Sequence, residues 1–234
     1  MKRIHQLFFI AALFPIAAQS QITIQADEIE MVGFTAINSR DTTPDSTIVI
    51  GGAGQQIWDY SGLSNDEQST LKFFEAAELP YANEFPAANV GAEIDTGIYI
   101  FFQQNSEHIV TFGTFGNFEY GPFNLTTTFK YTPPLTSIRF PMQFEDAFTE
   151  TAVSTIQVPG TAIGITSDSV RAVTTNRRFV HVDAYGQLTT PLGTFDALRS
   201  KEIEVTTDTI YVLTNGFWFP AQGGPCLLYT SRCV

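Results

Sequence analysis

The sequence predicts an all-β protein, mainly antiparallel, folded as a β-sandwich or as a strongly curved sheet that partly closes. Thr, Val, Ile, Phe and Tyr dominate the chain, with 21 Phe and 8 Tyr, and these residue types favour strands. Clusters of Gly, Pro, Asn and Asp separate the apolar runs, as turns between short strands require. Helix candidates are confined to residues 65–77 and 144–149, and Thr70, Phe73 and Phe74 favour a strand from Thr70 onward in the first of them.

Along the chain, residues 97–102 are apolar at every position and predict a strand covered on both faces. Three segments are polar or rich in Gly and Pro and predict loops: residues 40–64, 79–89 and 131–141. Each also contains aromatic residues that favour burial, so we interpret them as loops within a domain rather than as linkers. We therefore expect one all-β domain over residues 21–225.

Two segments alternate clearly between two kinds of side chain. The aliphatic positions are Val180, Val182 and Ala184 in the first and Ile203 and Val205 in the second, and they alternate with Phe179, His181 and Asp183 and with Glu202 and Glu204. We expect the aliphatic positions to be buried and the two glutamates to be solvated, because acidic side chains are rarely buried without partners.

A tight turn is predicted between these two segments. Residues 190–193 read Thr-Pro-Leu-Gly, with proline and glycine at the second and fourth positions that a type I turn favours. The turn separates two strand-like runs, so residues 170–213 are predicted to form consecutive antiparallel strands without a helix.

The first twenty residues predict a signal peptide. Lys2 and Arg3 give a short positive region, and residues 7–18 form an apolar run that is too short to span a bilayer. Ala18 and Ser20 then place small residues at the positions that a signal peptidase reads, so we expect cleavage after residue 20. The mature protein is therefore expected outside the cytoplasm.

Residues 226–234 predict a non-native tail. They read Cys-Leu-Leu-Tyr-Thr-Ser-Arg-Cys-Val, which back-translates to a transposon sequencing adapter joined to its own reverse complement. The alternative is a natural tail that can be encoded in the same way. On the adapter interpretation, native sequence ends near Pro225 and the tail contacts nothing in the fold. Cys226 and Cys233 are the only cysteines, so we expect neither a native disulfide nor thiol chemistry.

The charge of the chain restricts its partners. There are 24 acidic and 12 basic residues, a formal net charge of −12. Nucleic acids and anionic membrane surfaces attract basic patches, so we expect neither as a partner. Four acids in polar segments offer oxygens for Ca²⁺: Asp41, Asp45, Asp66 and Glu67. They lack the spacing of a calcium-binding loop, so we interpret them as a solvated acidic loop and expect no cofactor.

Three motifs carry a resemblance to known proteins. Residues 58–63 read W-D-Y-S-G-L, residues 183–199 read D-A-Y-G-Q-L-T-T-P-L-G-T-F-D-A-L-R, and residues 217–221 read F-W-F-P-A. They resemble the W-D-[FY]-S-x-L, D-x-Y-G-x-L-x-T-P-x-G-x-[FY] and W-[FY]-x-P-G motifs of uncharacterised exported β-rich proteins from bacteria that use type IX secretion. The resemblance implies secretion from, or display on, a Gram-negative cell. It also implies a sorting domain after the β domain, before which this chain is truncated, and it transfers no catalytic residue.

The sequence carries few signs of catalytic chemistry. The sequence contains no G-x-S-x-G, H-E-x-x-H, P-loop or EF-hand motif. His181 and Asp183 share one face of a predicted strand and offer half a metal site, although we interpret them as an exposed polar face. Glu145, Asp146, Glu202 and Glu204 offer carboxylate pairs for glycoside hydrolysis, although solvated charge is the interpretation that we adopt.

Residues 112–123 are the strongest candidate for a binding surface. This segment places five aromatic residues among glycines: Phe112, Phe115, Phe118, Tyr120 and Phe123. Aromatic side chains on such a surface stack on sugar rings or line an apolar cleft. The alternative is that they cover the core beneath a long loop. If the protein binds a ligand, we expect this segment at the rim of the main groove, with a glycan or another cell-surface protein as the partner.

These observations predict an exported, non-enzymatic module for binding or interaction. The alternative is a carbohydrate-active or other hydrolytic enzyme, which would show a convergent pair of acids in a cleft. A flat or aromatic-lined surface would favour the binding module.

Overall fold

The computed structural model describes residues 22–43, 49–120 and 123–233. The predicted signal peptide and Asp45 lie outside these ranges. Within them the chain forms thirteen strands and four short 3₁₀ helices. The strands are β1 (Thr23–Ile24), β2 (Thr35–Arg40), β3 (Gly54–Asp59), β4 (Glu67–Glu75), β5 (Val90–Asp95), β6 (Ile98–Gln104), β7 (His108–Tyr120), β8 (Phe123–Arg139), β9 (Met142–Gln143), β10 (Ala147–Pro159), β11 (Ser169–Thr190), β12 (Gly193–Thr214) and β13 (Phe217–Cys233). The helices are η1 (Ala26–Glu28), η2 (Ala76–Glu78), η3 (Ala82–Glu84) and η4 (Gly160–Ile163).

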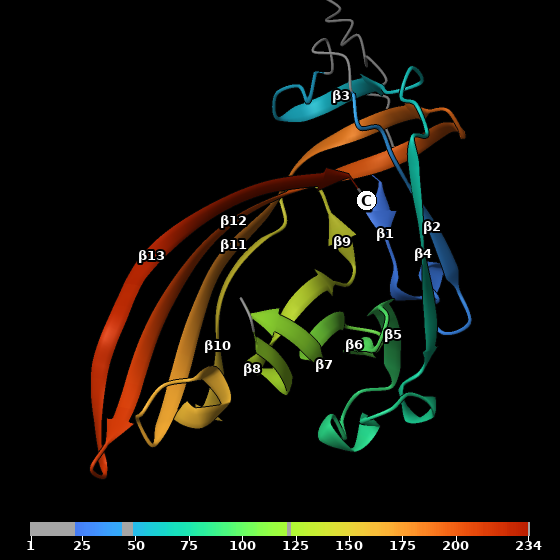
Figure 1. Ribbon diagram of the computed structural model, residues 1–234. Coiled ribbons are helices and arrows are strands. Elements are labelled where there is room, and N and C mark those ends of the chain that lie inside the picture. Colours follow the sequence, from blue (N-terminus) through green and yellow to red (C-terminus); the bar gives the residue numbers. More distant parts are fainter. Residues whose placement is uncertain (1–21, 44–48, 121–122, 234) are drawn as a thin grey trace, which may run out of the picture.

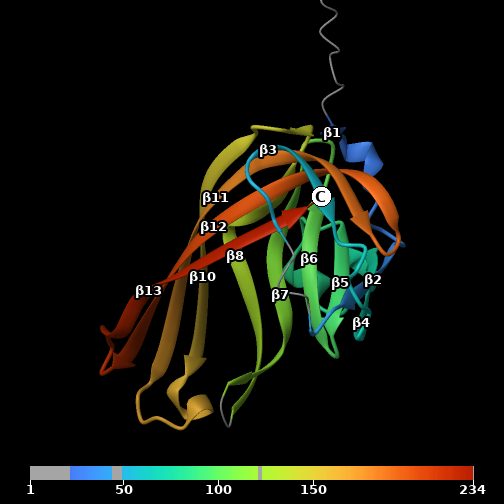
Figure 2. The same cartoon turned by 90° about the horizontal axis from the view of Figure 1, so that it is seen from above.

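Eleven of these strands form one sheet in the order β13-β12-β11-β10-β8-β7-β6-β5-β4-β2, with β3 paired to β11. β3 runs parallel to β11, whereas the neighbours along the main path are antiparallel. The long strands β11, β12 and β13 form an arch over β8 and β10 (Figure 1), and the view from above shows the sheet bending round from β13 toward β2 (Figure 2). The all-β, mainly antiparallel prediction is confirmed, in its curved-sheet form.

The predicted hairpin is confirmed. β11 and β12 each contain 22 residues and pair from Ser169 opposite Leu213 to Thr190 opposite Gly193. Their register shifts once, between Val182 and Ala184. Such a β-bulge re-aims the side chain that it contains.

Parts of two predicted loops are strands instead. Residues 54–59 form β3, which pairs with β11. The pairing of β11 with β10 ends at His181, so the edge of β11 beyond that residue has backbone groups available for a parallel strand. Residues 131–139 belong to β8 despite Pro133 and Pro134. Proline is tolerated there because β8 meets β10 through one register pair, Thr132 with Val153, so few ladder hydrogen bonds are lost.

The two faces of the β11–β12 hairpin are partly reversed relative to our expectation. Ile203 is 37% exposed and Phe179 is 43% exposed, whereas Glu202 and Glu204 are half-buried on the concave face. The solvated interpretation of the glutamates was therefore wrong. The physical reason is Arg178, which is buried on the same face, pairs with Glu202 and lies near enough to Glu204 for its positive charge to act on that carboxylate.

Buried side chains form three clusters that hold the sheet. Trp58 lies with Ala184 and Ala197 between β3 and the hairpin, and Leu198 lies with Met142 and Val182 near β9. In the third cluster, Phe85 stacks on Phe101 with ring centroids 4.4 Å apart. Phe85 comes from the predicted loop 79–89, which therefore covers the outer face of β6.

The backbone of residues 226–233 is part of β13. It pairs with β12 from Cys226 opposite Thr206 to Cys233 opposite Arg199. The expectation that the tail contacts nothing was therefore wrong for the backbone. The exposed edge of a sheet pairs through main-chain groups, which every residue type except proline supplies in full. A non-native segment can therefore pair there as well as a native one, and the non-native origin of the tail stays a prediction.

Candidate functional site

An apolar cleft of about 560 Å³ lies on the concave face of the sheet. Its walls come from β7, β8, β10, β11, β12 and the η4 segment, and its only polar side chains among the described residues are Thr127 and Thr174. β7 and β12 are separated by β8, β10 and β11 in the sheet order, so one cleft reaches both only because the sheet is strongly curved.

One wall of the cleft is built of aliphatic rows that the strand register fixes. The rows run across β10, β11 and β12, and they consist of Val158, Val170 and Val212 and then of Ile156, Ala172 and Ile210. Side chains two residues apart along a strand point to the same face, so the rows are about 7 Å apart. β-branched residues fit this half-buried surface and stiffen it.

Phe118 and Phe129 form the facing wall. Their rings meet edge to face, with centroids 4.7 Å apart and an interplanar angle of 78°. Phe118 stands on β7 and Phe129 on β8, beside Leu125 and Thr127. The cleft is therefore aromatic on one side and aliphatic on the other.

The five predicted aromatic residues do not act together. Phe118 lines the cleft, whereas Phe112 and Phe115 pack on the opposite face against the cluster that contains Phe85 and Phe101. Phe115 and Phe118 are three residues apart in a regular stretch of β7 and so point to opposite faces. The side chains of Tyr120 and Phe123 lie outside the described part of the chain.

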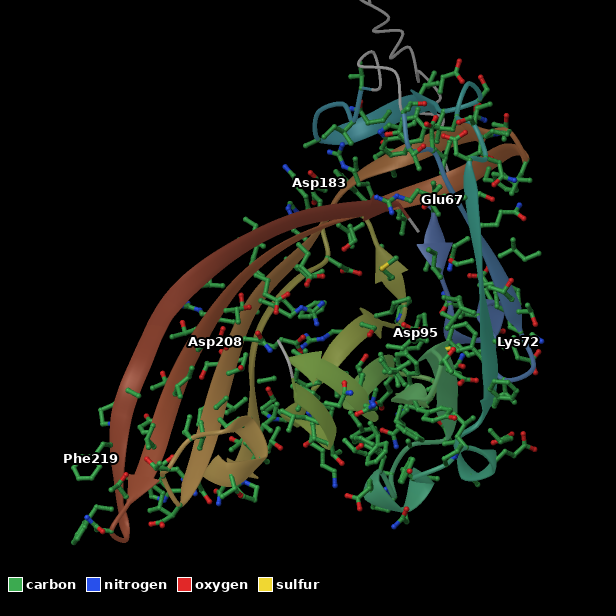
Figure 3. The ribbon with its side chains drawn as sticks, in the orientation of Figure 1. Glu67, Lys72, Asp95, Asp183, Asp208 and Phe219 are labelled. Atoms are coloured by element: carbon green, nitrogen blue, oxygen red, sulfur yellow. The ribbon has the colours of Figure 1, made fainter. Side chains whose placement is uncertain are left out.

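Polar side chains replace the aliphatic rows farther along the same strands. Thr174, at the end of the cleft, donates a hydrogen bond of 2.6 Å from Oγ1 to Oδ1 of Asp208 directly opposite. In the next row, the hydroxyl of Thr206 donates to Oδ1 of Asn176 at 2.9 Å. Asp208 lies midway along the arch and is exposed (Figure 3). The concave face thus changes from apolar to polar over two rows.

An ion-pair cluster centred on Arg178 occupies the next row of the concave face, beyond Asn176 and Thr206. Arg178 holds Glu202 with two hydrogen bonds, Nε to Oε1 at 2.7 Å and Nη2 to Oε2 at 2.8 Å, and contacts Oε1 of Glu150 through Nη1 at 3.1 Å. Nη1 also donates to the carbonyl of Thr136, whose own N–H donates to Glu150 at 3.0 Å. Pro133 and Pro134 lack N–H groups, and the backbone ladder of β8 is interrupted there. The Arg178 cluster joins β8 to β10 and β11 next to this interruption.

Tyr131 belongs to the same environment. Burial raises the pKa of its hydroxyl above the ordinary value, the negative charge of Glu204 adds to this effect, and the positive charge of Arg178 opposes it. The hydroxyl is therefore neutral at physiological pH and can donate a hydrogen bond.

Asp183 is buried, which corrects the interpretation that it shares an exposed polar face with His181. It is 4% exposed and accepts hydrogen bonds from Arg199 at 2.8 and 3.0 Å, while Nζ of Lys201 lies 3.4 Å away. The bulge between Val182 and Ala184 turns it inward. Burial alone would raise the pKa of Asp183, but the hydrogen bonds and charge of Arg199, aided by Lys201, outweigh it and hold the pKa below its ordinary value.

The guanidinium of Arg199 joins the two longest motifs of the sequence. Arg199 donates to the carbonyls of Ile50, Gly51 and Gly52, just before β3, and Nε1 of Trp58 donates to the carbonyl of Ile50 at 2.9 Å. Figure 3 shows Asp183 between β3 and the top of the arch. The W-D-Y-S-G-L segment and the Asp183–Arg199 hairpin therefore form one structural unit.

The acidic loop is held by its own hydrogen bonds. Asp66 accepts from the N–H and hydroxyl of Thr42, both at 2.9 Å, and Asp41 accepts from the N–H of Ser64 at 3.0 Å. The hydrogen bonds that Asp66 accepts, from the Thr42 N–H first and then from the hydroxyls of Ser64 and Thr42, hold the pKa of Asp66 below its ordinary value. Glu67 pairs instead with Arg40 at 3.6 Å. Within the described ranges no three His, Cys, Asp or Glu side chains are grouped to hold a metal ion.

The four acids considered for glycoside hydrolysis are not arranged as one site. Asp146 accepts a hydrogen bond of 2.7 Å from the N–H of Gln143 and so caps the turn before β10. Glu145 is in that turn with a positive φ of 73°. Glu202 belongs to the Arg178 cluster, and Glu204 lies near it.

Comparison of the chain with protein-family models, with curated proteins and with solved structures found no match. Across the described residues, the chain has no helix with the length and apolar character that crossing a membrane demands.

The aliphatic wall of the cleft was missed in the sequence. Its signal is a pair of aliphatic residues at i and i+2 near the end of each long strand: Ile156 with Val158, Val170 with Ala172, and Ile210 with Val212. Each pair alone is typical of any half-buried strand. Only the register, which places the three pairs in the same rows, makes them one surface.

Proposed function

We propose that the chain is an exported, non-enzymatic binding module that holds an apolar ligand in the cleft between Phe118 and the aliphatic rows. The observation that carries the proposal is the cleft, whose volume of about 560 Å³ falls within the range of about 300–1,000 Å³ that is typical of small-molecule sites. Its lining is almost wholly aliphatic and aromatic. Export is supported by the signal-like residues 1–20 and by the resemblance to type IX exported proteins.

The lining favours an apolar occupant over a glycan. A sugar needs hydrogen-bond partners for its hydroxyls beside an aromatic ring, and Thr127 and Thr174 are the polar side chains that the described lining offers. An apolar chain buries its surface there without leaving polar groups unpaired. An apolar segment of another cell-surface protein would use the same wall.

The hydrolytic alternative has less support. Glu150 and Glu202 converge on Arg178, and both are hydrogen-bonded to it. A general acid or nucleophile must reach substrate, whereas these oxygens are already engaged in joining β8, β10 and β12.

The proposal is tested with N-phenyl-1-naphthylamine, a neutral apolar dye that fluoresces when it leaves water. Ala172→Phe fills the cleft, and Val173→Phe places the same ring on the opposite face of β11 as a matched control. We expect the wild type and Val173→Phe to bind the dye and Ala172→Phe to lose at least tenfold in affinity, with unfolding measured in parallel. Equal affinity of all three proteins would contradict the proposal.

A further inference from the structure

The charge of the concave face is strongly one-sided next to the cleft. Along β10, β11 and β12, the register places four carboxylates on this face, Glu150, Glu202, Glu204 and Asp208. Arg178 is the one basic residue on the same face of the described parts of these strands. Among the described side chains, Arg178 forms ion pairs with Glu150 and Glu202 and neither Glu204 nor Asp208 forms one, so these two carboxylates add further negative charge to the face.

Asp208 brings that charge to the end of the cleft. It lies one row beyond Ile210, about 7 Å along β12, and is hydrogen-bonded to Thr174 in the lining. Glu204 follows on the same face about 13 Å farther along the strand. A ligand whose apolar part fills the cleft therefore places its other end beside an exposed carboxylate.

The length of the apolar cleft limits the length of the alkyl chain that it can hold. The rows from Val170 to Thr174 extend about 13 Å along β11, which matches an extended alkyl chain of about ten carbons. Attraction between unlike charges favours a cationic end group at Asp208, and repulsion disfavours a carboxylate or phosphate there.

We infer that the cleft takes a single-chain amphiphile of about this length whose head group is cationic, with the chain between Phe118 and the aliphatic rows and the head beside Asp208. The inference rests on the proposed function and adds the class of ligand. It is carried by the juxtaposition of the apolar cleft with the acidic rows on the same strands.

The test is displacement of N-phenyl-1-naphthylamine by three probes with the same chain: decyltrimethylammonium, 1-decanol and decanoate. Each is used below the concentration at which it aggregates, at pH 7.5 and low salt. We expect the ammonium to displace the dye at a concentration at least tenfold lower than decanoate does, with decanol between them. Added salt should reduce the difference, because it screens the exposed carboxylate.

Asp208→Asn should reduce the preference for the ammonium over decanoate at least threefold while leaving affinity for the neutral dye unchanged, which also shows that the variant is folded. Asp196→Asn, at an exposed position of the same strand, is the control and should keep the full preference. Equal displacement by the ammonium and decanoate, or a preference that Asp208→Asn retains, would overturn the inference while leaving the proposed function standing. Failure of all three probes, decanol included, would instead reject the proposed function.

Discussion

Arg199 holds the carboxylate of Asp183 with two hydrogen bonds, Nε to Oδ1 at 2.8 Å and Nη2 to Oδ2 at 3.0 Å. Both side chains are almost fully buried, and the Nη1 and Nη2 groups of the same guanidinium also donate to the carbonyls that precede β3. Asp183 therefore fixes the guanidinium, and the guanidinium fixes β3 against β11. Asp183 and Arg199, the first and last residues of the hairpin motif, thus act together to hold β3 in place.

Asp183→Asn should destabilise the protein by about 3 kcal/mol at pH 7, because it leaves the charge of Arg199 buried without its carboxylate. Urea unfolding measures the free energy of unfolding of wild type and variant. Asp196→Asn removes a carboxylate from an exposed position in the same hairpin and should change stability by less than about 0.5 kcal/mol. Equal effects of the two substitutions would show that the buried pair adds no stability.

The stability difference between wild type and Asp183→Asn should depend on pH. The pKa of Asp183 is lower in the folded protein than its ordinary value, so its contribution is complete above the unfolded pKa of about 3.9 and is lost as the pH falls through the folded pKa. We expect the difference to be constant from about pH 7 to 5 and to shrink below about pH 4. A difference that disappears already at pH 6 would contradict this.

Gly186→Ala should displace β3 from β11. Gly186 has a φ of +152°, and a Cβ atom there would lie 1.8 Å from the carbonyl oxygen of Gln56 on β3. We expect a loss of about 3 kcal/mol, since both backbone strain and steric overlap oppose the substitution. Gly62→Ala is the control, because its Cβ would meet no atom within 4 Å. Thermal unfolding of both variants measures the two losses. Equal melting temperatures would contradict the close approach of Gly186 to the backbone of Gln56.

Arg178→Met should weaken the junction between β8 and β10. The substitution leaves Glu150 and Glu202 without their shared cation, so we expect a loss of about 3 kcal/mol and faster hydrogen exchange of the Thr136 amide. Arg177→Met changes the neighbouring residue, which is exposed on the other face of β11, and should leave that amide protected. Unchanged exchange in Arg178→Met would show that the cluster does not hold the junction.

The β11–β12 hairpin was predictable because its information is local. Pro191 and Gly193 define the turn, and alternation on both sides defines two strands, so no distant residue is needed. The orientation of the hairpin was not predictable in the same way. Alternation separates Ile203 from Glu202 but does not say which face is covered, and that depends on Arg178, 24 residues away in sequence from Glu202.

The candidate site was predictable only in part for a related reason. Phe118 stood out in an aromatic segment, yet its segment is a regular strand that sends Phe115 to the opposite face. The partners of Phe118 in the cleft come from β10, β11 and β12, and their meeting depends on the curvature of the whole sheet. Curvature arises from bulges and long-range pairing, which no single segment encodes.

The most direct test of the binding proposal is NMR contact mapping with 1-decanol and methyl-labelled isoleucine. Ile156 and Ile210 line the cleft, whereas Ile203 stands on the opposite face of β12 and is partly exposed. We predict intermolecular NOEs from the alkyl chain to the methyl groups of Ile156 and Ile210 and none to Ile203. NOEs to Ile203 but not to Ile156 and Ile210, or no NOEs at saturating decanol, would contradict the proposal that this cleft is the binding site.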